Sequence, residues 1–195
     1  TKMTIILFCL FIQNIVSAQV TDVKYMLRFN DTTELFDAFL IAEAGNATTV
    51  QQRTQFNSQF SVVVPSGSSV SVSENFLPLL GNQNYNSMTP REWRIMNSIT
   101  APLSNPHNDY HAINVSLSPS AHYNNITQGD TLKLFSLSVQ PIPACKQEVR
   151  MFENDTDPTS QDPSFMGGDF SNGFTMGSTI QLYSGNIVGN IIPIP

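Results

Sequence analysis

The sequence is poor in charged residues, in cysteine and, outside short stretches, in good helix formers. Only 12% of its 195 residues are charged, against about a quarter in ordinary globular proteins, and 9 Lys+Arg face 15 Asp+Glu. No basic cluster occurs along the chain, so nothing is available to neutralise a phosphate backbone. The composition therefore argues against nucleic acid as a partner.

Cysteine is too scarce for a disulfide framework, because the chain has only Cys9 and Cys145. Cys9 lies in an apolar N-terminal run, and removal of that run leaves Cys145 as a single thiol. For Cys145 we expect either a small buried hydrophobic side chain or the remaining half of a bridge that relatives possess.

Motifs for catalysis are missing as well. The sequence has no Gly-x-Ser-x-Gly, no phosphate-binding loop, no His-Glu-x-x-His and no cysteine pair. Its three histidines are His107, His111 and His122, and their scatter is more typical of surface or hydrogen-bonded residues than of a zinc site. We predict that the protein is not an enzyme and that it requires no cofactor.

What is present is a hydrophobic content of 41% combined with many Asn, Ser and Thr, which suits strands and turns. Apolar and polar residues alternate in short runs that turn residues separate. The expected strands are 23–29, 36–44, 60–65, 69–73, 113–117, 132–139, 149–152 and 180–183. Eight or nine such strands predict an all-β protein, a two-sheet antiparallel β-sandwich with long loops.

Two places in this pattern are ambiguous. The apolar phase changes between Leu134 and Phe135, which indicates a bulge or burial on both faces. Thr89 to Glu92 has the layout of a helix capping box, but alternation follows at Trp93 to Asn97, so we favour a strand there. The residues expected between the sheets are Phe36, Leu40, Val62, Val64, Ile113, Val115, Leu117, Leu134 and Leu137.

The N-terminus has the features of a secretory signal peptide. Lys2 precedes an apolar run from Met3 to Ile12, and Val16-Ser-Ala18 precedes Gln19. We expect residues 1–18 to be a signal peptide, or an apolar donor strand if they are retained, and residues 19–195 to form a single sandwich domain. The run is too short to cross a bilayer, so we predict a secreted or cell-surface protein whose mature chain has no transmembrane span.

An acidic stretch near the C-terminus is the best candidate for a metal site. Its oxygen-rich side chains, on a backbone rich in glycine, are of the kind that Ca²⁺ binds, although the spacing is not that of an EF-hand. The alternative is that these residues only cap turns. The candidate calcium ligands are Asp155, Asp157, Asp162 and Asp169.

Acceptor triplets for N-linked sugars are frequent, although a chain so rich in Asn, Ser and Thr also produces them by chance. Four of the five asparagines fall at expected turns or loop edges. The candidate asparagines are Asn30, Asn46, Asn114, Asn125 and Asn154.

Several segments, taken in order and spacing, resemble one family. They are Phe56 to Pro65, Thr100-Ala-Pro with Asn108-Asp-Tyr110, Gly129 to Phe135, Val149 to Asn154 and Gly167 to Gly173. Together they resemble the cohesin-like β-sandwich modules of secreted surface proteins from Bacteroidota-type bacteria. The resemblance implies a cohesin-like or jelly-roll type of sandwich with a scaffolding or adhesive role and no catalysis. It also implies Thr32 and Thr131 as O-linked sugar acceptors.

Two hypotheses for function follow. In the first, the protein is the repeating subunit of a surface fibre, in which each sandwich donates an apolar strand to an open sheet edge of the next copy. The apolar stretches 5–23 and 187–195 motivate this hypothesis. In the second, the protein is a non-catalytic module that binds calcium, carbohydrate or a protein partner through its loops.

Overall fold

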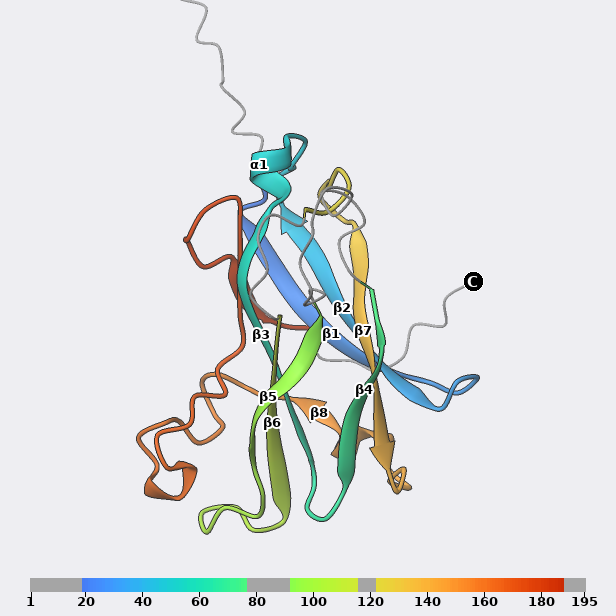
Figure 1. The fold of residues 1–195 in the computed structure, drawn as a ribbon, viewed down its shortest axis with the longest axis vertical. Helices are drawn as coiled ribbons and strands as arrows, with labels where there is room; N and C mark the ends of the chain where they lie inside the picture. The colour runs from blue at the N-terminus through green and yellow to red at the C-terminus, as the bar shows by residue number, and fades with distance from the viewer. Residues whose placement is uncertain (1–18, 77–91, 116–121, 188–195) are drawn as a thin grey trace, which may run out of the picture.

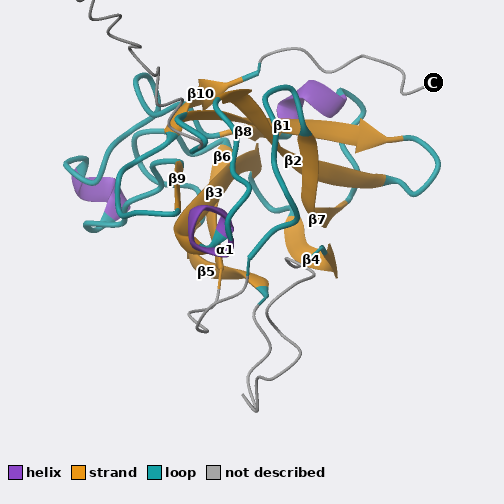
Figure 2. Ribbon diagram, turned by 90° about the horizontal axis from the view of Figure 1, so that it is seen from above, coloured by secondary structure: helices purple, strands orange, loops and turns teal. Residues whose placement is uncertain are grey.

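The computed structural model describes residues 19–76, 92–115 and 122–187. In this part of the chain, strands form two sheets that pack against each other (Figures 1 and 2). The first sheet has the order β10-β1-β2-β7-β4, and the second has the order β5-β6-β3-β8 with β9 also paired to β3. The strands are β1 (Asp22–Asn30), β2 (Leu35–Ala44), β3 (Gln55–Pro65), β4 (Ser69–Asn75), β5 (Trp93–Ile99), β6 (Asn108–Val115), β7 (Thr131–Gln140), β8 (Arg150–Met151), β9 (Gly173–Met176) and β10 (Tyr183–Asn186).

Within the described residues, helix is confined to three short turns, α1 (Val50–Arg53), η1 (Lys146–Glu148) and η2 (Pro163–Phe165). Neighbouring strands are antiparallel except β1 and β10, which run parallel. The predicted all-β, two-sheet sandwich is confirmed.

The main core lies between the sheets and contains the residues expected there. The side chains of Phe36, Val62, Ile113 and Leu134 are fully buried in it. Leu40, Val64, Val115 and Leu137 belong to the same cluster, whereas Leu117 lies outside the described residues. Burial of such apolar side chains is the main force that holds two sheets together.

Most strands fall where the alternation places them, but β3 begins at Gln55 instead of 60, β8 has only two residues, and β9 was not predicted. Two further differences concern β6 and the last strand. β6 begins at Asn108, earlier than the predicted 113, because the polar residues at its start are buried and hydrogen-bonded. The last strand is Tyr183–Asn186 instead of 180–183, and Ile180 is exposed. There the Leu182 N–H donates to the Phe174 carbonyl, which turns the chain before the strand starts.

The bulge predicted in β7 is confirmed. Ala38 of β2 pairs with Phe135 and Phe39 pairs with Lys133, so Leu134 has no partner in that register. Leu134 and Phe135 are both buried in the core. A second irregularity interrupts β4 between Val72 and Glu74.

A second core lies on the other face of the β3 sheet. The long segment 152–172, seen in orange at the side of β5 and β6 in Figure 1, folds over that face. Three of its aromatic side chains belong to this core. The Tyr110 ring centroid lies 4.8 Å from that of Phe165 and 6.1 Å from that of Phe170. The members of this second core are Val63, Ile99, Tyr110, Ala112, Phe152, Phe165 and Phe170.

The expectation of a buried Cys145 is wrong. Its thiol is free and exposed, and its Sγ donates a hydrogen bond to the Gln147 side chain at 3.0 Å. Cys145 stands just before the η1 turn, where the chain runs over the surface between β7 and β8. Its apolar neighbours in the sequence, Pro143 and Ala144, were a poor guide because they are not buried either.

Candidate functional site

The candidate site is the outer edge of β1 at Leu27 and Phe29, called here the β1 edge. β10 covers β1 only from Val23 to Tyr25. On that side the Val23 N–H donates to the Leu182 carbonyl, and the Tyr25 carbonyl accepts from the Ile187 N–H. Alternate residues of a strand direct their backbone groups to the same edge, so Leu27 and Phe29 also present an N–H and a carbonyl there. Leu27 and Phe29 pair with β2 on their other side, but on this side no strand of the described residues pairs with them.

Apolar side chains lie on the inner side of the β1 edge. Leu27 is buried in the main core, and Phe29 packs against that core with its ring centroid 4.9 Å from that of Phe36. The Lys146 ammonium of η1 lies over the Phe29 ring, 4.9 Å from its centroid. Such a contact favours a charged amine at the ring face.

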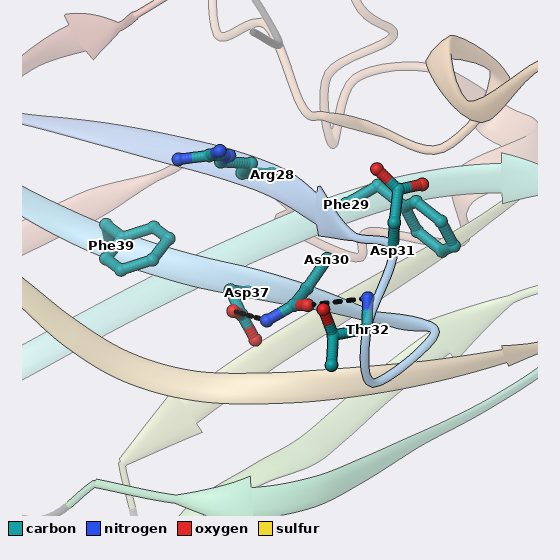
Figure 3. Close-up of a pocket in the computed structure, with 7 residues that line it drawn as sticks. All are labelled: Arg28, Phe29, Asn30, Asp31, Thr32, Asp37 and Phe39. Carbon is teal, nitrogen blue, oxygen red and sulfur yellow. Dashed lines mark hydrogen bonds between the residues drawn. The ribbon is translucent and has the colours of Figure 1, made fainter. Parts of the chain in front are cut away.

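A cavity of about 330 Å³ opens on the outer side, at the end of the β1–β2 hairpin. Figure 3 shows Arg28 and Phe39 at one end of it and Asp31 and Thr32 at the other. Between them the Asn30 amide donates to Asp37 at 3.2 Å, while its carbonyl accepts from the Thr32 N–H at 3.0 Å (Figure 3).

This arrangement has the chemistry of a strand acceptor. Unpaired backbone donors and acceptors at a sheet edge template the pairing of another strand. Pockets beside such an edge can receive the alternate side chains of the added strand.

Two other outer strands, β4 and β5, are joined to each other at one end. The Trp93 backbone N–H donates to Oδ1 of the Asn75 side chain at 2.7 Å, and the side-chain amide of Asn75 donates back to the Trp93 backbone carbonyl at 3.3 Å. Asn75 thus occupies the backbone groups of Trp93 as a strand neighbour would. The β1 edge has no such side-chain partner among the described residues.

Three of the four candidate calcium ligands serve a local contact. The Asp157 carboxylate pairs with Arg150, Asp162 accepts from the Ser164 N–H, and Asp169 accepts from the Ser171 N–H. Asp155 is exposed. Within residues 19–76, 92–115 and 122–187, no three His, Cys, Asp or Glu side chains converge as metal ligands. The calcium site stays a prediction.

The five candidate asparagines differ in how their side chains are used. Three side-chain amides donate hydrogen bonds: Asn30 to the Asp37 carboxylate, Asn114 to the Gln59 side chain, and Asn154 to the Asn172 backbone carbonyl. The Asn46 carbonyl oxygen accepts from the Gln128 N–H. Asn125 is exposed, as are Thr32 and Thr131.

The histidines do not form a site. His107 is exposed and His122 is buried, and neither adjoins His111 in a group of potential ligands among the described residues. His111 is buried, with its Nδ1 2.8 Å from the Ser98 hydroxyl. Burial lowers the pKa of His111, and the Asp109 carboxylate opposes part of that shift.

Comparison of the chain with protein-family models, with curated proteins and with solved structures found no match. The resemblance to cohesin-like modules therefore stays a prediction. Among the described residues, no helix has both the length and the apolar character that a membrane span requires.

Proposed function

We propose that this chain is an extracellular structural or adhesive protein, the repeating subunit of a surface fibre whose protomers are joined by strand addition. The observation that supports it is the β1 edge, where Leu27 and Phe29 have backbone groups that no described strand pairs. Proteins that remain single generally shield such an edge with charge, proline or a covering loop.

The strand donated to the β1 edge of a neighbouring copy cannot be β1 itself. Val20 to Phe29 is not free for this role, because β1 belongs to the chain's own sheet and Val20, Val23 and Tyr25 are fully buried. The remaining apolar candidates are the segments 5–16 and 187–194, and the first belongs to the expected signal peptide.

We assign the donor role to the segment 187–194 of a neighbouring copy. β10 runs parallel to β1 and its pairing stops at Tyr25, so a strand continuing in the same direction passes Leu27 and Phe29. Supplied by a neighbouring copy, this segment would pair with Leu27 and Phe29 across two chains. Exchange of an element between copies is a low-cost route to assembly, and a head-to-tail contact that does not close produces a filament.

The experiment compares the full chain with two variants by electron microscopy and sedimentation. Replacement of Ile191, Ile192 and Ile194 by Ser removes the apolar donor side chains. Phe29→Pro removes one N–H from the acceptor edge and leaves the β1–β2 pairs intact, because that N–H faces away from β2. Phe29→Leu is the matched control, since it keeps the N–H.

We expect filaments from the full chain and from Phe29→Leu, and soluble sandwiches from the other two variants. Monomers from the intact chain at high concentration would reject the fibre and favour the alternative, a non-catalytic module that binds calcium, carbohydrate or a protein partner. Filaments from the triple Ser variant would reject the assigned donor.

A further inference from the structure

The cavity of about 330 Å³ beside the β1 edge is lined by two charged side chains that have no partner. Within the described residues, no hydrogen bond or ion pair involves the Arg28 guanidinium or the Asp31 carboxylate. Asp37, the third charged residue of the lining, is paired with Lys133 of β7 at 3.0 Å. One positive and one negative group are therefore available to a ligand in this cavity.

The register of β1 and β2 places the cavity on the outer face of the sheet. Arg28 and Asp37 are register partners, and Phe39 lies two residues further along β2. Because alternate residues of a strand face the same side, these three side chains share that face. The ring of Phe39 supplies an apolar part of the lining beside Arg28 (Figure 3).

The β1–β2 turn fixes the other end of the cavity. Oδ1 of Asn30 accepts from the backbone N–H groups of Thr32 at 3.0 Å and of Thr33 at 3.3 Å. The Asn30 amide in turn donates to Asp37 at 3.2 Å, which ties the turn to β2. Asp31 and Thr32 thus stand at this end before any ligand enters, and groups positioned in advance reduce the free energy that binding costs.

The lining specifies the chemistry of the ligand. A guanidinium binds a carboxylate through two parallel N–H donors, so Arg28 calls for one carboxylate at its end. Asp31 repels a second anionic group and accepts hydrogen bonds, so the other end calls for hydrogen-bond donors. A free amino acid carries its carboxylate and its amine on one carbon, and it cannot span from Arg28 to Asp31 at the opposite end (Figure 3).

A sugar acid has all of these features. It carries one carboxylate at one end of a ring, hydroxyls that donate and accept around the rest of the ring, and C–H groups that pack on an aromatic side chain. The cavity volume is within the range of small-molecule sites. The donor segment 187–194 has no charged residue, so strand addition leaves Arg28 and Asp31 unused.

We propose that this cavity binds a hexuronate, the acidic sugar unit of anionic polysaccharides. Arg28 pairs with its carboxylate, Asp31 and Thr32 bind its hydroxyls, and Phe39 packs against its C–H groups. The site goes beyond strand addition and does not depend on it, because the side chains of Arg28 and Phe39 lie on the sheet face, whereas strand addition uses the backbone of Leu27 and Phe29.

Equilibrium dialysis of the full chain tests the site, with galacturonate and glucuronate as probes. The protein comes from a host that adds no sugars, because Asn30 and Thr32 of the lining are themselves candidate acceptors. Galactose and glucose are the matched neutral sugars, since each differs from its uronate only at C6. We expect saturable binding of a uronate, about tenfold tighter than of its neutral counterpart, because only the uronate gives Arg28 a charged partner.

Three results of this experiment would reject the proposal. The first is no saturable binding of either uronate, and the second is equal binding of the neutral sugars. The third is acetate binding as tight as uronate binding, which would show that Arg28 takes any carboxylate and that the ring contributes nothing.

Variants separate the roles of the charge and of the hydroxyl. Arg28→Met keeps the length of the side chain, so we expect uronate affinity to fall about tenfold, to that of the neutral sugar, while binding of the neutral sugar stays the same. Arg28→Lys keeps the charge and should retain more affinity than Arg28→Met. Thr32→Val should weaken binding of both sugars, because it removes a hydroxyl and leaves the charge of Arg28 in place.

The matched control is Arg94→Met on β5, whose guanidinium pairs with Glu92 at 2.9 Å in the other sheet. We expect wild-type uronate binding from this variant. Unchanged affinity in Arg28→Met, or an equal loss in Arg94→Met, would contradict the assigned role of Arg28. Monomers that bind a uronate would reject the fibre and keep this site, whereas filaments that bind no uronate would do the reverse.

Discussion

Arg150 holds Asp157 through two parallel hydrogen bonds, each 2.6 Å long, between the guanidinium nitrogens and the two carboxylate oxygens. Asp157 also accepts from the Glu153 N–H at 2.8 Å. The pair fastens the start of the segment 152–172 to β8, beside the Tyr110 ring of the second core. The hydrogen bond to Asp157 also raises the pKa of Arg150.

Arg150→Ala should therefore destabilise the fold by about 1–3 kcal/mol, because the buried Asp157 carboxylate loses its charged partner. Urea unfolding measures the change, and limited proteolysis should show earlier cleavage within 152–172. Arg94→Ala is the control, since its pair with Glu92 is more exposed, and it should stay within about 0.5 kcal/mol of wild type. Equal effects of the two variants would contradict a special role for Arg150.

Stability should fall as the pH drops below the usual pKa of histidine, 6.5, because of His111. Burial lowers the pKa of His111 in the folded chain. As the pH falls, the imidazole of the unfolded chain is therefore protonated before that of the folded chain, and this protonation stabilises the unfolded state relative to the folded state. The contribution of His111 is complete above pH 6.5 and is lost progressively below it. Chemical unfolding at a series of pH values should show a flatter profile for His111→Gln than for wild type, and an unchanged profile would contradict the role of His111.

Gly45→Ala should destabilise the fold more than Gly67→Ala. Both glycines have a positive φ, +80° and +86°, where an alanine is strained by about 1–2 kcal/mol. A Cβ at Gly45 would in addition collide with the Gln19 carbonyl oxygen, whereas one at Gly67 meets nothing. Thermal unfolding of the two variants measures the difference, and equal melting temperatures would show that the chain near Gln19 yields without cost.

Asn125 should be the most fully modified of the five candidate asparagines when the chain is secreted by a host that attaches N-linked sugars. Its side chain is exposed, while the amides of Asn30, Asn114 and Asn154 already donate to neighbouring groups. Mass spectrometry of glycopeptides measures the occupancy of each site. Higher occupancy at Asn114 than at Asn125 would mean that modification precedes folding.

The strands were predictable wherever burial of one sheet face makes apolar and polar residues alternate along the sequence. β1 and β2 are examples, and so is the bulge at Leu134, which shows in the sequence as a break in phase. The start of β6 was missed because Asp109 is polar and yet buried. Its carboxylate accepts from the Gly67 and Ala101 N–H groups, and both lie in turns that only the folded chain brings to it.

The second core and the candidate site were harder to foresee for the same reason. Phe165 and Phe170 follow neither the strand period nor the helix period, so the sequence predicts a loop for the acidic stretch. No local pattern indicates that these two rings pack on Tyr110. The sequence predicted an apolar donor but gave no acceptor edge, because an edge depends on which strands become neighbours. Asp37 is a charged residue within the apolar run 36–44, and no local pattern predicts its ion pair with Lys133 of β7.

The parallel pairing of β10 with β1 has a consequence for the order of events during synthesis. Among the described strands, β1 is the first to be synthesised and β10 is the last. β2 can pair with β1 at once through a short hairpin, but the opposite side of β1 must wait for nearly the whole chain. Throughout that interval the backbone groups of β1 on the β10 side have no partner among the described strands, and unpaired strand edges of this kind make incompletely folded chains prone to aggregation.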